Sequence, residues 1–174
     1  MKTLWLCLSI CVLAFALTFA ETRTEKLEDK IRNEFLHLTQ KQSVPTIKAF
    51  ELKKIIDDSN LILIDIRESK EQQVSMLPHS LSTVEFAQKF KHGIPSRSKI
   101  VTYCTIGYRS GIYAGELRKQ QIIAYNLEGG ILAWSHIHGE IFAKDSSGQW
   151  IKTNRIHVYA KEWNFVHPDY QAVW

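Results

Sequence analysis

The chain has too few cysteines and too little charge for several common protein classes. Of its three cysteines, Cys7 and Cys11 fall in an N-terminal apolar run within residues 1–20. Residues 21–174 therefore contain Cys104 alone. A single cysteine cannot form an internal disulfide, which excludes a disulfide-stabilised scaffold. The net charge is only +4, and the absence of a dense lysine or arginine stripe argues against nucleic-acid binding. With 174 residues and 45% apolar composition, one domain with a packed core is expected.

Residues 1–20 have the pattern of a secretory signal peptide. Lys2 supplies a positive charge, residues 4–17 are almost wholly apolar, and Ala20 is a small residue suited to signal peptidase. We therefore expect an exported protein, periplasmic or secreted, with no stable membrane span after cleavage. The apolar run is close to the minimum length for a span, so an uncleaved membrane anchor is the alternative.

Residues 21–43 predict an amphipathic helix that precedes the main domain. Its apolar side chains recur on one face, at Leu27, Ile31, Phe35 and Leu38. We expect this face to pack on the domain, and binding to a protein partner is the alternative.

Residues 44–141 alternate between short apolar runs and segments with helical spacing. Leu61–Asp65 is a continuous apolar strand of the kind that a parallel sheet covered on both faces requires. Ile100, Val101 and Tyr103 are β-branched or aromatic and suit a second buried strand. Pro45 suggests an edge position for a first strand. The fold class is therefore predicted to be α/β, a central parallel sheet flanked by helices on both faces.

Cys104 opens a short loop between a predicted strand and a predicted helix. Backbone N–H groups and the helix N-terminus converge there, which should lower the thiol pKa below its free value of ~8.5. Gly107 permits a tight curl, Arg109 can hold an anionic substrate beside the sulfur, and Ser110 can cap the helix. A buried structural cysteine is the alternative.

The loop resembles the active-site loop of rhodanese-like sulfurtransferases, in which a cysteine opens a six-residue cradle and accepts a sulfur atom as a persulfide. LIDIRESKE (Leu63–Glu71), LPHS (Leu77–Ser80) and LEGGILAW (Leu127–Trp134) follow the family's order and distances. The resemblance covers residues 44–141 and implies a rhodanese-like sheet with Cys104 as the catalytic residue. It also implies a substrate-binding active-site loop made of Thr105, Ile106, Gly107, Tyr108, Arg109 and Ser110.

The same resemblance assigns supporting roles to Asp65 and Arg67 at the end of a strand. Asp65 is expected to form hydrogen bonds around the active site, whereas Arg67 is expected to pair with Glu71 and hold the following loop. Structural ion pairing is the alternative for both residues.

The size of the loop distinguishes two chemistries. Cysteine phosphatases use Cys-x5-Arg, which leaves room for a phosphate, but only four residues separate Cys104 from Arg109. A smaller ring should fit a sulfur atom better than a tetrahedral oxyanion. The count therefore favours sulfur transfer over phosphate hydrolysis.

The resemblance implies a sulfurtransferase that moves a sulfane sulfur through a Cys104 persulfide. The expected partners are a small sulfur donor, thiosulfate or a persulfide, and an acceptor, a thiol or cyanide; no cofactor is implied. Thr105 stands where several thiosulfate-using members carry a basic residue, which counts against thiosulfate as the natural donor. A non-catalytic binding or sulfur-sensing module is the alternative function.

Residues 142–174 predict an extension packed on the domain. A hairpin with a turn at Asp145–Gly148 is followed by four large aromatics that are too apolar for a disordered tail: Trp163, Phe165, Tyr170 and Trp174. An exposed interaction patch is the alternative. Residues 135–174 contain four histidines, whose spacing does not predict a metal site: His136, His138, His157 and His167.

Overall fold

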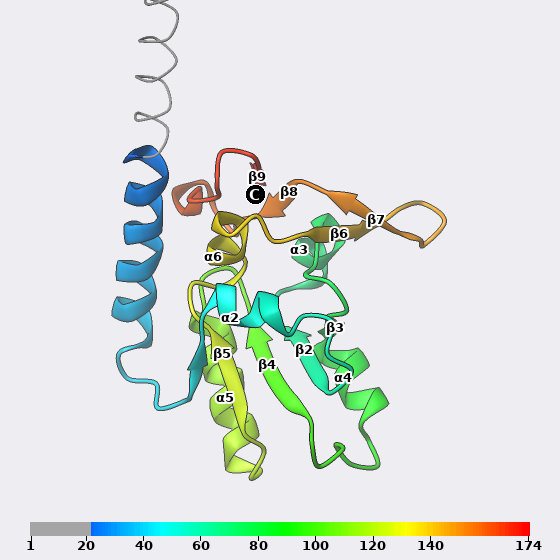
Figure 1. Cartoon of the computed structure of the whole chain (residues 1–174). Helices are drawn as coiled ribbons and strands as arrows, with labels where there is room; N and C mark the ends of the chain where they lie inside the picture. The colour runs from blue at the N-terminus through cyan, green and yellow to red at the C-terminus, as the bar shows by residue number, and fades with distance from the viewer. Residues whose placement is uncertain (1–21) are drawn as a thin grey trace, which may run out of the picture.

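The computed structural model describes residues 22–174; the expected signal peptide at residues 1–20 lies outside them. The described chain forms one five-stranded sheet and two two-stranded sheets (Figure 1). The main sheet consists of β1 (Thr46–Ile47), β2 (Leu61–Asp65), β3 (Leu81–Ser82), β4 (Lys99–Tyr103) and β5 (Ala124–Leu127). All neighbours are parallel, in the order β1-β5-β4-β2-β3. The predicted α/β class and the edge position of the first strand are confirmed.

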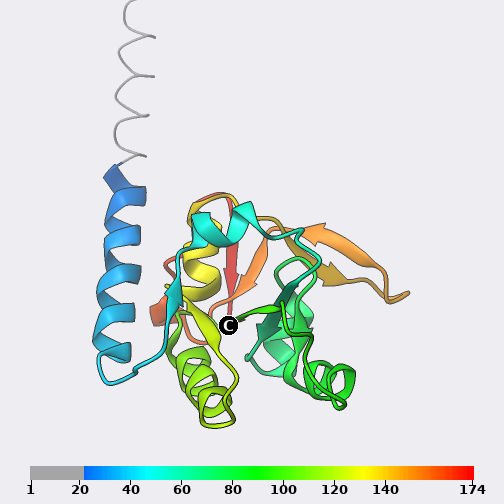
Figure 2. The ribbon, with the colours of Figure 1, turned by 60° about the horizontal axis from the view of Figure 1, so that its bottom comes forward.

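Helices cover both faces of this sheet. They are α2 (Ala49–Lys54), α3 (Ser69–Val74), α4 (Thr83–Lys89), α5 (Tyr108–Lys119) and α6 (Gly130–His136). Figure 2 shows α2 and α6 on one side of the strands and α4 and α5 on the other. Successive side chains of a strand point to opposite faces of the sheet and so belong to two separate cores. Leu63 and Val101 pack with α2 and α6 on one face. Ile62 and Ile100 pack with α4 and α5 on the other. Burial on both faces is the reason these strands are continuously apolar.

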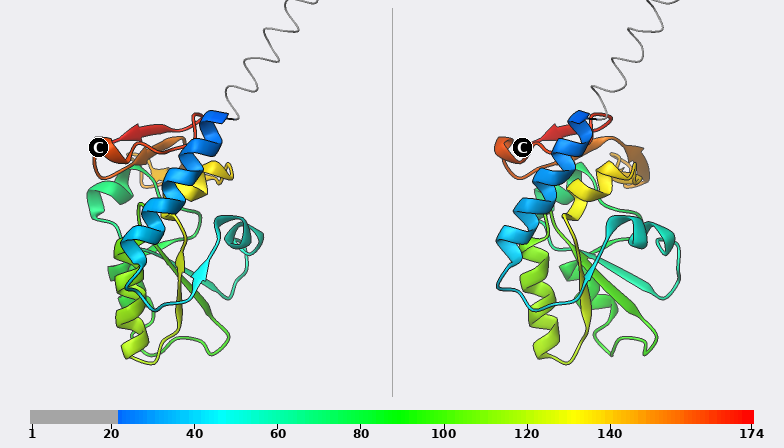
Figure 3. Two further views of the ribbon diagram at one scale, coloured as in Figure 1. Left: turned by 90° about the vertical axis from the view of Figure 1, so that its left-hand side faces the viewer. Right: turned by 60° about the vertical axis from the view of Figure 1, so that its left-hand side comes forward.

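The N-terminal helix is described at residues 22–39 and lies beside α6 (Figure 3). Ile31 and Phe35 are buried in the core that contains α2 and α6, and Leu38 packs against it. The apolar face predicted from the sequence is therefore the face turned toward the domain. Between residues 22 and 174, no helix is both long enough and apolar enough to cross a membrane.

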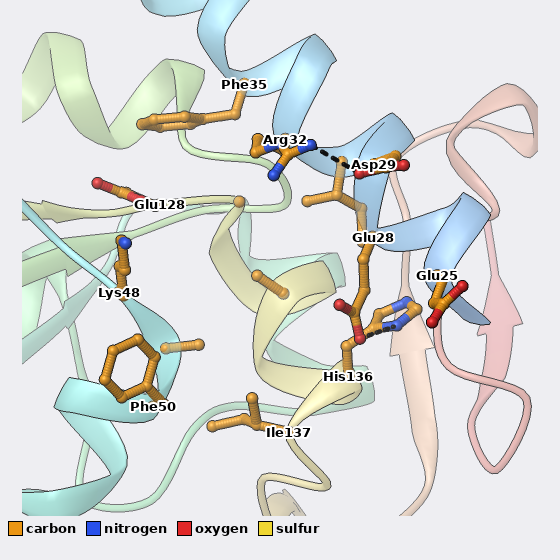
Figure 4. A pocket seen from close by; sticks show the side chains of 14 residues that line it. Glu25, Glu28, Asp29, Arg32, Phe35, Lys48, Phe50, Glu128, His136 and Ile137 are labelled. Carbon is orange, nitrogen blue, oxygen red and sulfur yellow. Dashed lines mark hydrogen bonds and ion pairs between the residues drawn. The ribbon is translucent and has the colours of Figure 1, made fainter. Parts of the chain in front are cut away.

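A pocket of about 500 Å³ opens where the N-terminal helix meets α2 and α6 (Figure 4). In it, Arg32 pairs with Asp29 at 2.7 Å, and the Glu28 carboxylate lies 3.5 Å from Nδ1 of His136. No residue of the cysteine loop, residues 104–110, lines this pocket. Charged side chains of the N-terminal helix and of the domain line this part of their contact.

The C-terminal extension lies over the carboxyl ends of the main strands (Figure 1). It contains an antiparallel hairpin, β6 (Ile141–Lys144) and β7 (Trp150–Thr153), and a parallel pair, β8 (Arg155–His157) and β9 (Gln171–Val173), with a 3₁₀ turn at Lys161–Trp163. Ile156 and Val158 are fully buried, and three of the four aromatics pack on the core: Trp163, Phe165 and Tyr170. Trp174 differs from the expectation because 59% of it remains exposed.

Candidate active site

The cysteine loop begins where β4 ends and turns directly into α5. Gly107 is the N-cap of α5 and has φ +103°, a left-handed conformation that glycine adopts without a steric penalty. A Cβ at this position would lie 2.6 Å from the Phe35 ring and 3.2 Å from the carbonyl oxygen of Leu127. The close packing of the N-terminal helix on the loop therefore requires glycine here.

The Cys104 side chain faces the inside of this curl and is only 1% exposed. The Gly107 N–H donates to the sulfur at 3.2 Å, and the Ser110 hydroxyl oxygen lies 3.5 Å from it. The Gly107 N–H is placed to stabilise negative charge on the sulfur. The prediction that Ser110 caps the helix is wrong, because its hydroxyl donates inward to Oδ1 of Asn126 at 2.7 Å.

The loop is supported from behind by β5 and the start of α6. Nδ2 of Asn126 donates to the Gly107 carbonyl at 2.8 Å, and the Ile131 N–H donates to the Cys104 carbonyl at 2.9 Å. A Cβ on Gly130 would lie 2.3 Å from that same Cys104 carbonyl oxygen. The double glycine is thus needed for close contact. Sequence reasoning missed Asn126, whose polarity in an apolar strand was the available clue.

Arg109 forms a bidentate pair with Glu71. Its Nη1 and Nη2 atoms each donate to a carboxylate oxygen at 2.7 Å, and Nη2 also donates to the Thr105 hydroxyl at 3.2 Å. The Glu71 side chain is fully buried, whereas 29% of the Arg109 side chain is exposed. Burial alone would raise the pKa of Glu71, but the hydrogen bonds from Arg109 and the Glu68 amide hold it below its usual value.

A second pair, Asp65 with Arg67, lies deeper. Neither side chain is exposed, and the shortest N–O distance is 2.7 Å. The prediction that Arg67 pairs with Glu71 is wrong, because a local turn brings the Arg67 N–H and guanidinium onto Asp65, at 2.9 Å for the N–H. Asp65 does reach the neighbouring strand β4, since the Tyr103 hydroxyl donates to it at 2.6 Å. Burial and the Asp65 charge raise the pKa of Tyr103.

The remaining loop residues divide into buried and exposed positions. Thr105 and Ile106 are buried, whereas the Tyr108 side chain is 45% exposed and its carbonyl accepts from Nε2 of Gln42. Outside the loop, the Tyr159 ring lies 5.5 Å from the Arg109 guanidinium carbon. No sequence pattern identified Tyr159 as a neighbour of the loop, because the contact depends on how the C-terminal extension folds back.

Comparisons with known proteins point to one domain family. The family model described as a rhodanese-like domain matches residues 48–137. A tRNA sulfurtransferase from Desulfurococcus amylolyticus is 37% identical over 83 residues, which are 47% of this chain but only 16% of that protein. The chain therefore spans less than a fifth of this curated relative.

Two solved structures show the same fold. A thiosulfate sulfurtransferase from Pseudomonas aeruginosa has a TM-score of 0.54 at 18% identity, over 68% of this chain and 23% of that one. A rhodanese-like domain from Anabaena has a TM-score of 0.50 at 16% identity, over 58% and 80% of the two chains. At these identities the likeness shows the architecture alone.

Proposed function

This chain belongs to the rhodanese-like domain family, and from that premise we propose that it is a sulfurtransferase that carries a sulfane sulfur on Cys104. One observation carries the proposal. The Cys104 sulfur lies within a curl closed by only four residues before Arg109, where it meets the Gly107 N–H and the Ser110 hydroxyl. The sulfurtransferase named among the relatives supports the same chemistry.

The proposed reaction has two steps. The Cys104 thiolate attacks the outer sulfur of the donor, the donor's S–S bond breaks, and the leaving group departs with the bonding electron pair. This gives Cys104–S–S⁻. The acceptor thiolate then attacks the terminal sulfur and releases Cys104 as thiolate. Electrons and atoms balance without a redox partner, and the Gly107 N–H stabilises the sulfur anion.

The ion pair beside the thiol favours a persulfide donor over thiosulfate. The Arg109 charge is matched by the buried Glu71 carboxylate at 2.7 Å, and Thr105 contributes a hydroxyl rather than a second cation. A doubly charged donor therefore gains little net attraction here. A persulfide carries at most one negative charge on its reacting end, so its binding depends less on attraction to the Arg109 charge. We propose a small or protein-bound persulfide as the donor and a thiol as the acceptor.

Export through residues 1–20 is part of the proposal, and so is a secreted or periplasmic location. A mature N-terminus at Glu21, determined by mass spectrometry of protein from the native host, would support cleavage. Retention of Lys2 in that protein would contradict it.

Sulfur transfer is tested by turnover with three substrates. Wild-type protein and Cys104→Ser are incubated with a persulfide, with thiosulfate and with an aryl phosphate, and cyanide serves as the sulfur acceptor. We expect thiocyanate from the wild type, faster from persulfide than from thiosulfate, and no phosphate release. The Cys104→Ser protein should form none. Absence of turnover with every donor, while the thiol still titrates, would contradict the proposal and favour a binding module.

A further inference from the structure

Three metal-ligating side chains from two distant segments meet at the end of α6. His138 lies in the turn after α6, whereas His167 and Asp169 lie in the loop that leads into β9. The Asp169 Oδ2 atom is 3.3 Å from Nδ1 of His138 and 3.5 Å from Nδ1 of His167. The two imidazole centroids are 4.4 Å apart. The sequence did not predict this cluster, because 28 residues separate the two histidines.

These distances suit a shared cation better than direct hydrogen bonds. Zinc bonds of ~2.0–2.2 Å in tetrahedral geometry place neighbouring ligand atoms about 3.3 Å apart. Both carboxylate–imidazole distances are close to that spacing, and one ligand atom from each of the three residues can be chosen so that all lie within 4.8 Å. Nδ1 of His167 accepts the Asp169 N–H at 3.2 Å, so this nitrogen carries a lone pair and no proton. A cation bound at Nδ1 would take this lone pair in place of the Asp169 N–H.

The two segments are fixed relative to each other before any cation binds. The His167 N–H donates to the Ser135 hydroxyl at 3.0 Å, and the Tyr170 hydroxyl donates to the Gly139 carbonyl at 2.8 Å. His138 itself has φ +50°, an uncommon conformation that the surrounding contacts must hold. Preorganisation of this kind reduces the ordering cost of binding.

We propose that His138, His167 and Asp169 bind a Zn²⁺ ion that fastens the C-terminal extension to the end of α6. Two imidazole nitrogens and one carboxylate favour zinc over magnesium or calcium, which prefer all-oxygen sites. A water molecule completes the tetrahedron. The exposed side chains of His138 and Asp169, 60% and 67%, leave room for that water.

The position of the site gives the ion a structural role. Asp169 lies two residues before β9, β9 pairs with β8, and Tyr159 follows β8 and covers Arg109. Fixing the loop before β9 therefore limits the motion of the segment that carries Tyr159. Because none of the three ligands belongs to the cysteine loop, the proposal is independent of sulfur transfer.

The test measures zinc binding and thermal stability in the untagged chain. Every sample carries Cys104→Ser, which removes the one thiol between residues 21 and 174 that could bind zinc. Asp169→Asn removes the proposed carboxylate ligand. Asp57→Asn is the matched control, because His79 and Asp57 form an exposed pair at the same 3.3 Å without a third ligand.

We expect one zinc ion per chain by calorimetry, and a rise in Tm of about 5–10 °C at a zinc concentration 100 times Kd. Asp169→Asn should weaken binding at least about tenfold, as loss of one ligand from a small site does, and Asp57→Asn should not. Magnesium should neither bind in the calorimeter nor raise Tm. Equal zinc binding by Asp169→Asn and Asp57→Asn, absence of zinc binding, or an equal response to magnesium would overturn the proposal.

Discussion

Two arginine–carboxylate pairs support the active site, and they differ in their access to water. Asp65 and Arg67 are both fully buried; Asp65 also accepts from the Tyr103 hydroxyl, and Nη2 of Arg67 donates to the Ser75 carbonyl. The pair of Glu71 and Arg109 has a buried carboxylate but a partly exposed guanidinium beside the cysteine loop. Each pair joins residues near the carboxyl ends of the strands, yet only the second reaches the loop itself.

This difference in exposure gives the two pairs different roles: the buried pair stabilises the fold, and the partly exposed pair can take part in the proposed reaction. A buried pair cannot exchange partners without leaving an uncompensated charge, so Asp65 and Arg67 serve to fix the end of β2. Arg109 can exchange part of its contact with Glu71 for a substrate, because one side of its guanidinium is open to solvent. Each prediction below tests that separation.

The largest effect should come from breaking the deeper pair. Arg67→Met leaves Asp65 charged and buried, so the free energy of unfolding should fall by about 3–5 kcal/mol. Arg109→Met should cost less, about 1–3 kcal/mol, because 29% of the Arg109 side chain is exposed and water can enter where its guanidinium was. Urea unfolding of the two variants measures both values. Equal losses would contradict the distinction between the pairs.

The second effect is on catalysis. Arg109→Met should lower kcat/KM for persulfide by about 10-fold, the equivalent of one hydrogen bond of about 1.5 kcal/mol to a charged group. Arg109→Lys keeps the charge but loses the bidentate geometry, so its activity should fall between those of the wild type and Arg109→Met. Thiocyanate formation at saturating cyanide measures the effect. Wild-type activity in Arg109→Met would remove Arg109 from the substrate site.

A smaller effect should appear in donor preference. Glu71→Gln leaves the Arg109 charge unmatched, so kcat/KM for thiosulfate should rise about fivefold relative to persulfide, as one extra unit-charge interaction of about 1 kcal/mol allows. The control is Glu68→Gln, whose side chain is 59% exposed and bonds to Lys70. An unchanged donor ratio in Glu71→Gln would show that the ion pair does not set donor preference.

The smallest effect is in the pH dependence of stability. The pKa of Glu71 is lowered in the folded protein, so its contribution is present above its usual value of 4.5 and is lost as pH falls further. Glu71→Gln should therefore flatten the loss of stability below pH 4.5. Urea unfolding between pH 6 and pH 3 compares the variant with the wild type. An identical slope in both proteins would contradict the assigned shift.

The central strands and the cysteine loop could be predicted from the sequence because their signals are local. A continuous apolar run identifies β2 and β4, and Cys104, Gly107 and Arg109 lie within six residues of one another. No comparable local signal existed for the partners of the two arginines. Asp65 and Glu71 are both near enough in sequence to pair with Arg67. The turn after β2 places Arg67 on Asp65, and Glu71 pairs with Arg109.

Contacts between distant segments were also beyond the sequence. Phe35 packs on Gly107 and Tyr159 covers Arg109 because both chain extensions fold back on the domain, which no motif encodes. Ser110 has the residue type of a helix cap, but its hydroxyl instead donates a hydrogen bond to Asn126 on the neighbouring strand β5. Such choices depend on tertiary packing, which decides between hydrogen-bond partners that are equally suitable in sequence.

The most direct test of sulfur transfer through Cys104 is the intact mass of the protein after incubation with a small persulfide. The wild type should gain one sulfur, about 32 Da, and lose it again on addition of cyanide. Cys104→Ser, treated in the same way, should gain nothing. An unchanged wild-type mass with every donor, or an equal gain in Cys104→Ser, would contradict the account.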